Sequence, residues 1–413
     1  MSAPAPGEAL AGARRLVVKI GSALLVDDNG AIRHRWLDRL ADDVARCRAR
    51  GQDVILVSSG AVAVGRRHLG LAGNRLRLDE KQAAAATGQI RLAHAYQQAL
   101  ARHGITVAQI LLTLEDTEAR RRHLNARATF AQLLGLGAVP VVNENDTIAT
   151  SEIRFGDNDR LAARVAQMVS ADMLVLLSDI DGLYTADPRK EPDARHLALV
   201  AEIGPEIEAM AGEAAPGYSS GGMVTKLAAA RIAMNAGCRM LIARGAPKPG
   251  DEQRADEQRA DGERANGERA NGERGDEERG DEPGPLAAIE AGGRATLFLP
   301  RGEPSSARKA WIAGTVEPSG AVIVDDGAAR ALRQGRSLLP AGVVAVEGNF
   351  ERGDAVIVRS RSGAEAGRGL SAYSSADIRH IAGHKSGEIA GILGYRGRDE
   401  IIHRDDLVVT ERP

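Results

Sequence analysis

The chain has few aromatic residues, few cysteines and no long apolar run, and each shortage excludes a class of protein. Only 3% of its 413 residues are Phe, Trp or Tyr, so we expect a core packed from Ala, Val, Leu and Ile. Two cysteines are too few for a disulfide framework, which indicates a reducing, cytoplasmic location. No run of 18 apolar residues occurs, so we predict no membrane span. Residues 1–13 lack the cationic start and apolar run of a signal peptide, and we predict that they are disordered.

Lysine is also scarce, with seven residues against 47 arginines. Where nearly every cation is an arginine, a lysine indicates a site that needs a compact ammonium rather than a planar guanidinium. The nine histidines are scattered, and neither HExxH nor CxxC spacing occurs. We therefore predict no metal site built from protein side chains.

The first 245 residues alternate apolar runs with segments of helical periodicity. Strands are predicted at 16–20, 54–57, 105–112, 138–142, 173–177 and 240–243, and helices at 36–47, 81–102, 160–170 and 225–236. This alternation predicts an α/β fold, with a mostly parallel sheet between two layers of helices. In such sheets ligands bind outside the carboxyl ends of the strands, so polar residues that follow strands should share one edge.

Two later regions have different patterns. Residues 250–285 form imperfect five-residue units in which, over 251–282, 13 acids and six arginines give a local charge of −7. Because the only apolar side chains in these units are four alanines, we predict a disordered charged linker, with a short exposed helix as the alternative. Residues 286–413 show short β-like runs, at 295–299, 321–324, 342–346, 355–358 and 369–373, followed by a helical tail. We predict a small β-rich domain there.

Amides and carboxylates gather after the apolar run at 138–142. Asn143 and Asp146 lie in the first group, and Asp157, Asn158 and Asp159 follow about ten residues later. Such side chains at the end of a strand pack poorly but suit a small charged metabolite. This stretch is therefore predicted to form a substrate pocket.

Lys19 lies in an otherwise apolar strand that ends in Gly21 and Ser22. An unpaired buried ammonium is costly, so Lys19 is expected to face an anion, and the N–H groups of Gly21 and Ser22 indicate a phosphate. The residues alone also allow an edge lysine whose ammonium reaches solvent.

Ser59 and Gly60 lie between a strand and a predicted helix. Free N–H groups at a helix start bind carboxylate or phosphate. An ordinary helix cap without a ligand is the alternative.

A glycine-rich loop from 216 to 222 enters a helix that carries Lys226 near its start. It is not a Walker A sequence, but mobile N–H groups beside an ammonium could surround a polyphosphate in the same way, and a flexible hinge is the alternative. Ser178 and Asp179 also follow a strand and are predicted to contact a nucleotide, although the Asp-Gly and Asp-Pro pairs after them are plain turn formers.

Taken together, these motifs resemble the glutamate 5-kinases of the amino acid kinase family. The resemblance rests on VVKIGSALL (17–25), VSSGAVAVGR (57–66), VPVVNENDTIAT (139–150), FGDND (155–159), SDIDGLYTADPR (178–189) and GGMVTK (221–226). WIAG (311–314), GNFERGD (348–354) and IAGHKSGEIAGILGY (381–395) resemble that family's C-terminal PUA domain. The resemblance implies a three-layer amino acid kinase domain over 14–249 and a PUA domain with a helical tail over 286–413.

The resemblance also implies roles for individual residues. Lys19 and Lys226 would hold the transferring phosphoryl group, and Asp159 would orient them. The implied glutamate-binding residues are Ser59, Gly60, Asn143, Asp146, Asp157 and Asn158. The implied ATP contacts are Lys19, Ser178, Asp179, Ser220, Gly221, Gly222, Met223, Val224, Thr225 and Lys226.

The implied activity is the ATP-dependent phosphorylation of the L-glutamate side-chain carboxylate, the first step of proline biosynthesis, with Mg²⁺ bridging phosphate oxygens. From the family we also expect a homo-oligomer, feedback inhibition by proline and hand-over of the product to glutamyl phosphate reductase. The alternatives are a kinase of another substrate (acetylglutamate, aspartate or uridylate) and an RNA-binding PUA protein with a degenerate kinase scaffold. Residues 294–413 carry 17 Lys and Arg against 15 Asp and Glu, so we do not expect RNA binding.

Overall fold

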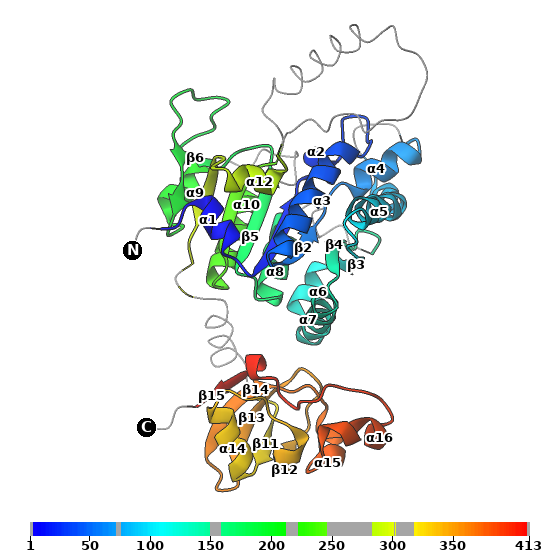
Figure 1. Ribbon diagram of the computed structural model, residues 1–413, viewed down its shortest axis with the longest axis vertical. Helices are drawn as coiled ribbons and strands as arrows, with labels where there is room; N and C mark the ends of the chain where they lie inside the picture. Colours follow the sequence, from blue (N-terminus) through cyan, green and yellow to red (C-terminus); the bar gives the residue numbers. More distant parts are fainter. Residues whose placement is uncertain are drawn as a thin grey trace.

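The computed structural model describes residues 3–71, 76–148, 158–211, 222–245, 283–300, 302 and 318–410 (Figure 1). Its larger domain is built on an eight-stranded sheet in the order β3-β4-β2-β1-β5-β9-β10-β8. The bounds are β1 Arg15–Ile20, β2 Asp53–Val57, β3 Val107–Leu112, β4 Val139–Glu144, β5 Met173–Ser178, β8 Leu199–Val200, β9 Arg239–Arg244 and β10 Ala295–Phe298. The strands from β3 to β9 are parallel, as predicted, and β10 is antiparallel to β9.

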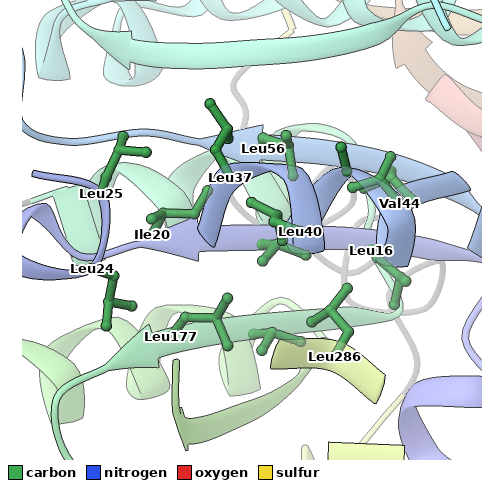
Figure 2. Close-up of a cluster of buried hydrophobic side chains, with 14 of the residues drawn as sticks. Leu16, Ile20, Leu24, Leu25, Leu37, Leu40, Val44, Leu56, Leu177 and Leu286 are labelled. Carbon is green, nitrogen blue, oxygen red and sulfur yellow. The ribbon is translucent and has the colours of Figure 1, made fainter. Parts of the chain in front are cut away.

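Helices cover both faces of this sheet, because its strands carry apolar side chains that point alternately to the two faces and both faces must be buried. One face packs against α3 (His34–Ala49) and α5 (Leu78–Ala101), and Figure 2 shows Leu16 and Ile20 of β1 beside Leu37 and Leu40 of α3. The other face packs against α7 (Arg120–Gly135), α8 (Asn158–Met168) and α10 (Met223–Asn235). The predicted three-layer sandwich is confirmed.

Shorter elements complete this domain. They are α1 Pro6–Ala11, α2 Ser22–Leu25, α4 Ala61–His68, α6 Leu114–Glu118, α9 Pro205–Met210, α12 Pro285–Glu290, β6 Leu183–Tyr184 and β7 His196–Leu197.

The smaller domain is a five-stranded sheet in the order β12-β11-β13-β14-β15. Its bounds are β11 Gly320–Val324, β12 Val343–Gly348, β13 Ala355–Ser360, β14 Glu365–Leu370, β15 Leu407–Val409, α14 Asp326–Arg333, α15 Ser375–Ile381 and α16 Ile389–Leu393. The β-rich domain with a helical segment is confirmed, but the strand expected at 369–373 is β14, which ends at Leu370. The domain contacts α7, where Leu124 packs against Ala355 and Leu370, and Arg127 forms an ion pair with Asp406.

Two predicted domain boundaries are wrong. The N-terminal residues expected to be disordered include α1, which begins with a proline at its first position and buries Ala9 and Leu10 in the core. The run at 295–299, assigned to the small domain, forms β10 and extends the large sheet beside β9. Both segments are short, and each is held by residues far away in the chain. The sequence alone therefore does not reveal what they pack against.

The chain leaves and re-enters this domain beside a single helix. Trp36 of α3 donates a hydrogen bond from Nε1 to the Gly245 carbonyl at 2.6 Å. Asp43, also on α3, accepts hydrogen bonds from the backbone N–H groups of Leu286 (2.6 Å) and Ala287 (3.2 Å) and so caps the start of α12. Residues 246–282, most of the predicted linker, lie outside the described residues.

Helices α4 and α5 approach so closely that their backbones touch. A Cβ atom added to Gly65 would lie 1.7 Å from the Ala84 carbonyl oxygen, and one added to Gly88 would lie 1.8 Å from the Ala61 carbonyl oxygen. Only glycine fits at these two positions. The crossing therefore fixes α5 against the first turn of α4, directly after Ser59 and Gly60.

We expect Gly88→Ala to lower the free energy of unfolding by about 3 kcal/mol, because the added methyl group must push two helix backbones apart. Urea unfolding followed by far-UV circular dichroism measures this loss. Gly135→Ala, at the end of α7 with no atom within 4 Å of its added Cβ, is the control and should change stability by less than about 0.5 kcal/mol. Equal stability of the two variants would contradict the crossing.

Candidate active site

Two buried lysines meet on one carboxylate at the carboxyl edge of the sheet. Lys19 shares a face of β1 with Val17, which packs in the cluster that contains α8 and α10 residues. Its Nζ lies 2.6 Å from Oδ1 of Asp159, in the first turn of α8, and Nζ of Lys226, in the first turn of α10, lies 3.4 Å from Oδ2. All three side chains are more than nine-tenths buried. The structure thus brings together the three residues predicted to be catalytic.

The charge of Asp159 is maintained by these neighbours. Burial by itself raises the pKa of its carboxyl group. Lys19 and Lys226 together lower that pKa by a larger amount, so the net pKa lies below the ordinary value. Asp159 is therefore ionised at neutral pH. Its two oxygens hold the two ammonium groups close together, an arrangement that suits a transferring phosphoryl group.

The end of the predicted nucleotide loop is joined to the same carboxylate. The Thr225 hydroxyl lies 3.2 Å from Oδ2 of Asp159 and 2.8 Å from the Gly222 carbonyl oxygen. Gly222 precedes α10, Met223 begins it, and Val224 is exposed. Ser220 and Gly221 lie outside the described residues.

A second cluster is built from amides and hydroxyls. Nδ2 of Asn158, at the start of α8, lies 2.9 Å from the Ser58 carbonyl oxygen, 2.8 Å from Oγ of Ser59 and 3.2 Å from Oδ1 of Asn143. These partners follow β2 and end β4, so the prediction that polar residues after strands converge is confirmed. Oδ1 of Asn158 is buried and accepts no hydrogen bond from any residue that the structure describes.

Gly60 allows the sharp turn from β2 into α4. Its φ of +95° is left-handed, and a Cβ there would lie 2.8 Å from Cγ2 of Val26. The turn positions Ser59 beside Asn158. The conformation itself accounts for a glycine at this position.

Asp146 lies just beyond β4 and is partly buried. Burial raises its pKa to about 6, and among the described residues no hydrogen bond or ion pair reaches its carboxylate. A carboxylate in this state suits a ligand that brings a cation. Asp157, predicted nearby, lies outside the described residues.

The end of β5 forms the neighbouring part of the edge. The Ser178 hydroxyl donates to Oδ1 of Asp179 at 2.9 Å, and the Ser178 carbonyl accepts from the N–H of Gly245. The N–H of Gly21 donates to the Leu177 carbonyl at 3.2 Å. The prediction that Gly21 offers a free N–H group to phosphate is therefore wrong, because that N–H continues the sheet.

Two residues that support this site, Gln89 and Tyr96, carry no signal in the sequence. The Tyr96 hydroxyl donates to Oγ of Ser58 at 3.1 Å, and Nδ2 of Asn143 donates to Oε1 of Gln89 at 2.6 Å. Gln89 and Tyr96 lie within α5, whose alanine-rich sequence reads as an ordinary packing helix. Their contacts are with residues distant in the chain, which periodicity does not reveal.

Across the described part of the chain, no cluster of three or more His, Cys, Asp or Glu side chains has the spacing to hold a metal ion. Within the same residues, no helix combines the length and apolar character needed to cross a membrane.

Comparison with known proteins agrees with this fold. Residues 14–244 match the amino acid kinase family, and residues 320–393 match the PUA domain. The chain is 63% identical to "Glutamate 5-kinase" of Paramagnetospirillum magneticum, covering 97% of this chain and 99% of that protein. It is 55% identical to "Glutamate 5-kinase" of Rhodospirillum rubrum (96% of each) and to "Glutamate 5-kinase 1" of Rhizobium meliloti (98% and 94%). The chain belongs to the amino acid kinase family, and within it to the glutamate 5-kinases.

Proposed function

We propose that this chain transfers the γ-phosphoryl group of ATP to the side-chain carboxylate of L-glutamate and forms L-glutamyl 5-phosphate, the first step of proline biosynthesis. The observation that carries the proposal is the contact of Lys19 and Lys226 with the two oxygens of Asp159, one residue from the amide cluster around Asn158. Identity of 63% to a glutamate 5-kinase over nearly the whole chain supports this substrate over another amino acid or a nucleotide.

The reaction requires positioning and charge compensation rather than a general base. A glutamate side chain has an ordinary pKa of about 4.3, so its carboxylate is already a nucleophile at neutral pH. One carboxylate oxygen forms a bond to the γ-phosphorus, while the bond from that phosphorus to the β–γ bridging oxygen breaks and its electrons leave with ADP. Lys19 and Lys226 stabilise the charge spread over the transferring oxygens, and Asp159 orients the two ammonium groups.

The amino acid is held, in this proposal, by the cluster that follows β2 and β4. Asp146 offers its carboxylate to the α-ammonium of glutamate, and the unpartnered Oδ1 of Asn158 accepts from it. Ser59, Gly60, Asn143 and Asp157 complete the pocket. One turn of α8 then joins the two substrates, because Asn158 contacts the amino acid and Asp159 holds the lysines.

The nucleotide is assigned to the other end of the site, beside Ser178, Asp179 and the loop from 220 to 226. Thr225 supports this placement, because its hydroxyl links the loop to Asp159. Mg²⁺ would enter with ATP, since the described residues offer no cluster of ligands for it and Asp159 is engaged by two lysines. It would add positive charge to the phosphates.

Further expectations follow from the family. We propose that proline competes in the amino acid pocket, that the enzyme is a cytoplasmic homo-oligomer, and that its labile acyl phosphate passes promptly to glutamyl phosphate reductase. Two free, buried cysteines support a reducing location. An RNA-binding protein with a degenerate kinase scaffold is not favoured, because the lysine pair and its carboxylate are assembled.

We expect Lys226→Ala to lower kcat by at least about 100-fold, the scale of losing one preorganised charge contact in the transition state. A coupled assay of ADP release with glutamate as acceptor measures it. Lys385→Ala, at an exposed residue of the small domain, is the control and should keep wild-type turnover. Near-normal kcat in Lys226→Ala would remove Lys226 from catalysis.

We expect kcat/KM for glutamate to fall about tenfold for each pH unit below about 6, because the raised pKa of Asp146 means that its carboxylate becomes protonated there and no longer attracts an ammonium. Asp146→Asn should lower kcat/KM at neutral pH and abolish this acid limb. The pH profile of kcat/KM for ATP at saturating glutamate is the control. An unchanged acid limb in Asp146→Asn would assign the titration to another group.

A further inference from the structure

We propose that Gln89 is a positioning residue for the amino acid substrate. Its Oε1 accepts from Nδ2 of Asn143 and so keeps Oδ1 of Asn143 toward Asn158. There Asn143 and the Ser58 carbonyl together hold Nδ2 of Asn158, so that Oδ1 of Asn158 is left to accept from the substrate ammonium. This inference rests on the proposed function, because it concerns the pocket assigned there to glutamate.

The orientation follows from the alternation of donors and acceptors. An amide side chain donates only from nitrogen and accepts only through oxygen. Gln89 presents Oε1 to Nδ2 of Asn143 at 2.6 Å, so Oδ1 of Asn143 is the atom available to Asn158. Nδ2 of Asn158 donates to that oxygen at 3.2 Å. If Asn143 turned over, two nitrogen donors would face each other.

The end of this chain of hydrogen bonds points to a ligand. Nδ2 of Asn158 is taken up by acceptors on the protein, while its Oδ1 is buried and accepts nothing from the described residues. A buried acceptor without a donor is unfavourable. An α-ammonium supplies three donors and satisfies it, whereas a reversed Asn158 amide would place N–H groups against that ammonium.

The helix backbone that carries Gln89 is held in place from two positions. It follows Gly88, where α5 touches the backbone of α4 and a Cβ would lie 1.8 Å from the Ala61 carbonyl oxygen. Two turns later on the same face of α5, the fully buried Tyr96 donates to Oγ of Ser58. Helix α5 therefore supports the amide cluster from two positions.

Three variants test the proposal in the full-length enzyme. Gln89→Met removes the acceptor at similar length, and we expect the KM for glutamate to rise about tenfold while kcat, the KM for ATP and the melting temperature stay close to wild type. Gln89→Glu keeps an acceptor and should hold the KM for glutamate within about threefold of wild type. Gln97→Met, at an exposed glutamine of the same helix, is the matched control and should match wild type.

A double variant tests the mechanism of positioning. In Asn143→Asp, a carboxylate accepts through either oxygen, so the contact between residue 143 and Nδ2 of Asn158 no longer depends on Gln89. Adding Gln89→Met to Asn143→Asp should then change the KM for glutamate by less than about twofold, a clear departure from additivity.

Three outcomes would overturn the inference. They are an unchanged KM for glutamate in Gln89→Met, a full tenfold effect in the Asn143→Asp background, and a parallel loss of melting temperature and of affinity for both substrates. A wild-type enzyme that does not phosphorylate glutamate would instead refute the proposed function, so the two failures are distinguishable.

Discussion

The shared carboxylate of Asp159 is the contact on which the rest of the site depends. Removing an ammonium from water costs more than a single ion pair usually returns, so a buried pair of this kind contributes little to stability. What it provides is geometry, because Lys19 from β1 and Lys226 from α10 are held against adjacent oxygens of one side chain. The next residue toward the N-terminus, Asn158, ties the same turn of α8 to β2 and β4.

The parallel sheet explains why these residues meet. Strands β4, β2, β1 and β5 lie side by side and run in one direction, so the segments that follow them emerge at one edge. Because successive side chains of a strand point to opposite faces of the sheet, alternate residues of β1 meet different helix layers. Val17 and Lys19 point toward the layer of α8 and α10, whereas Leu16, Val18 and Ile20 pack on the side of α3. Figure 2 shows Leu16 and Ile20 on that side. A single lysine in an apolar strand is thereby aimed at a carboxylate in the helix layer.

Much of this arrangement could be predicted from sequence. The strands and long helices carry strong apolar patterns, and the lysines and amides stand out against their surroundings. Elements that depend on distant partners could not be predicted. Helix α1 and strand β10 are short and are held by packing with remote segments, and Gln89 lies in a helix with no motif. The role of the Gly21 N–H cannot be read from sequence, because its acceptor, the Leu177 carbonyl, comes from another strand.

The fixed ends on either side of the charged segment bring the exit and the re-entry of the chain close together. Trp36 and Asp43, which hold Gly245 and the start of α12, are seven residues apart on α3, or about 10 Å along one rigid helix. The entropy of closing a loop between fixed points grows only with the logarithm of its length, so doubling the loop costs about 0.6 kcal/mol. A change in the number of residues between these two fixed points is therefore expected to cost little free energy and to leave the contacts of α3 with Gly245 and α12 in place.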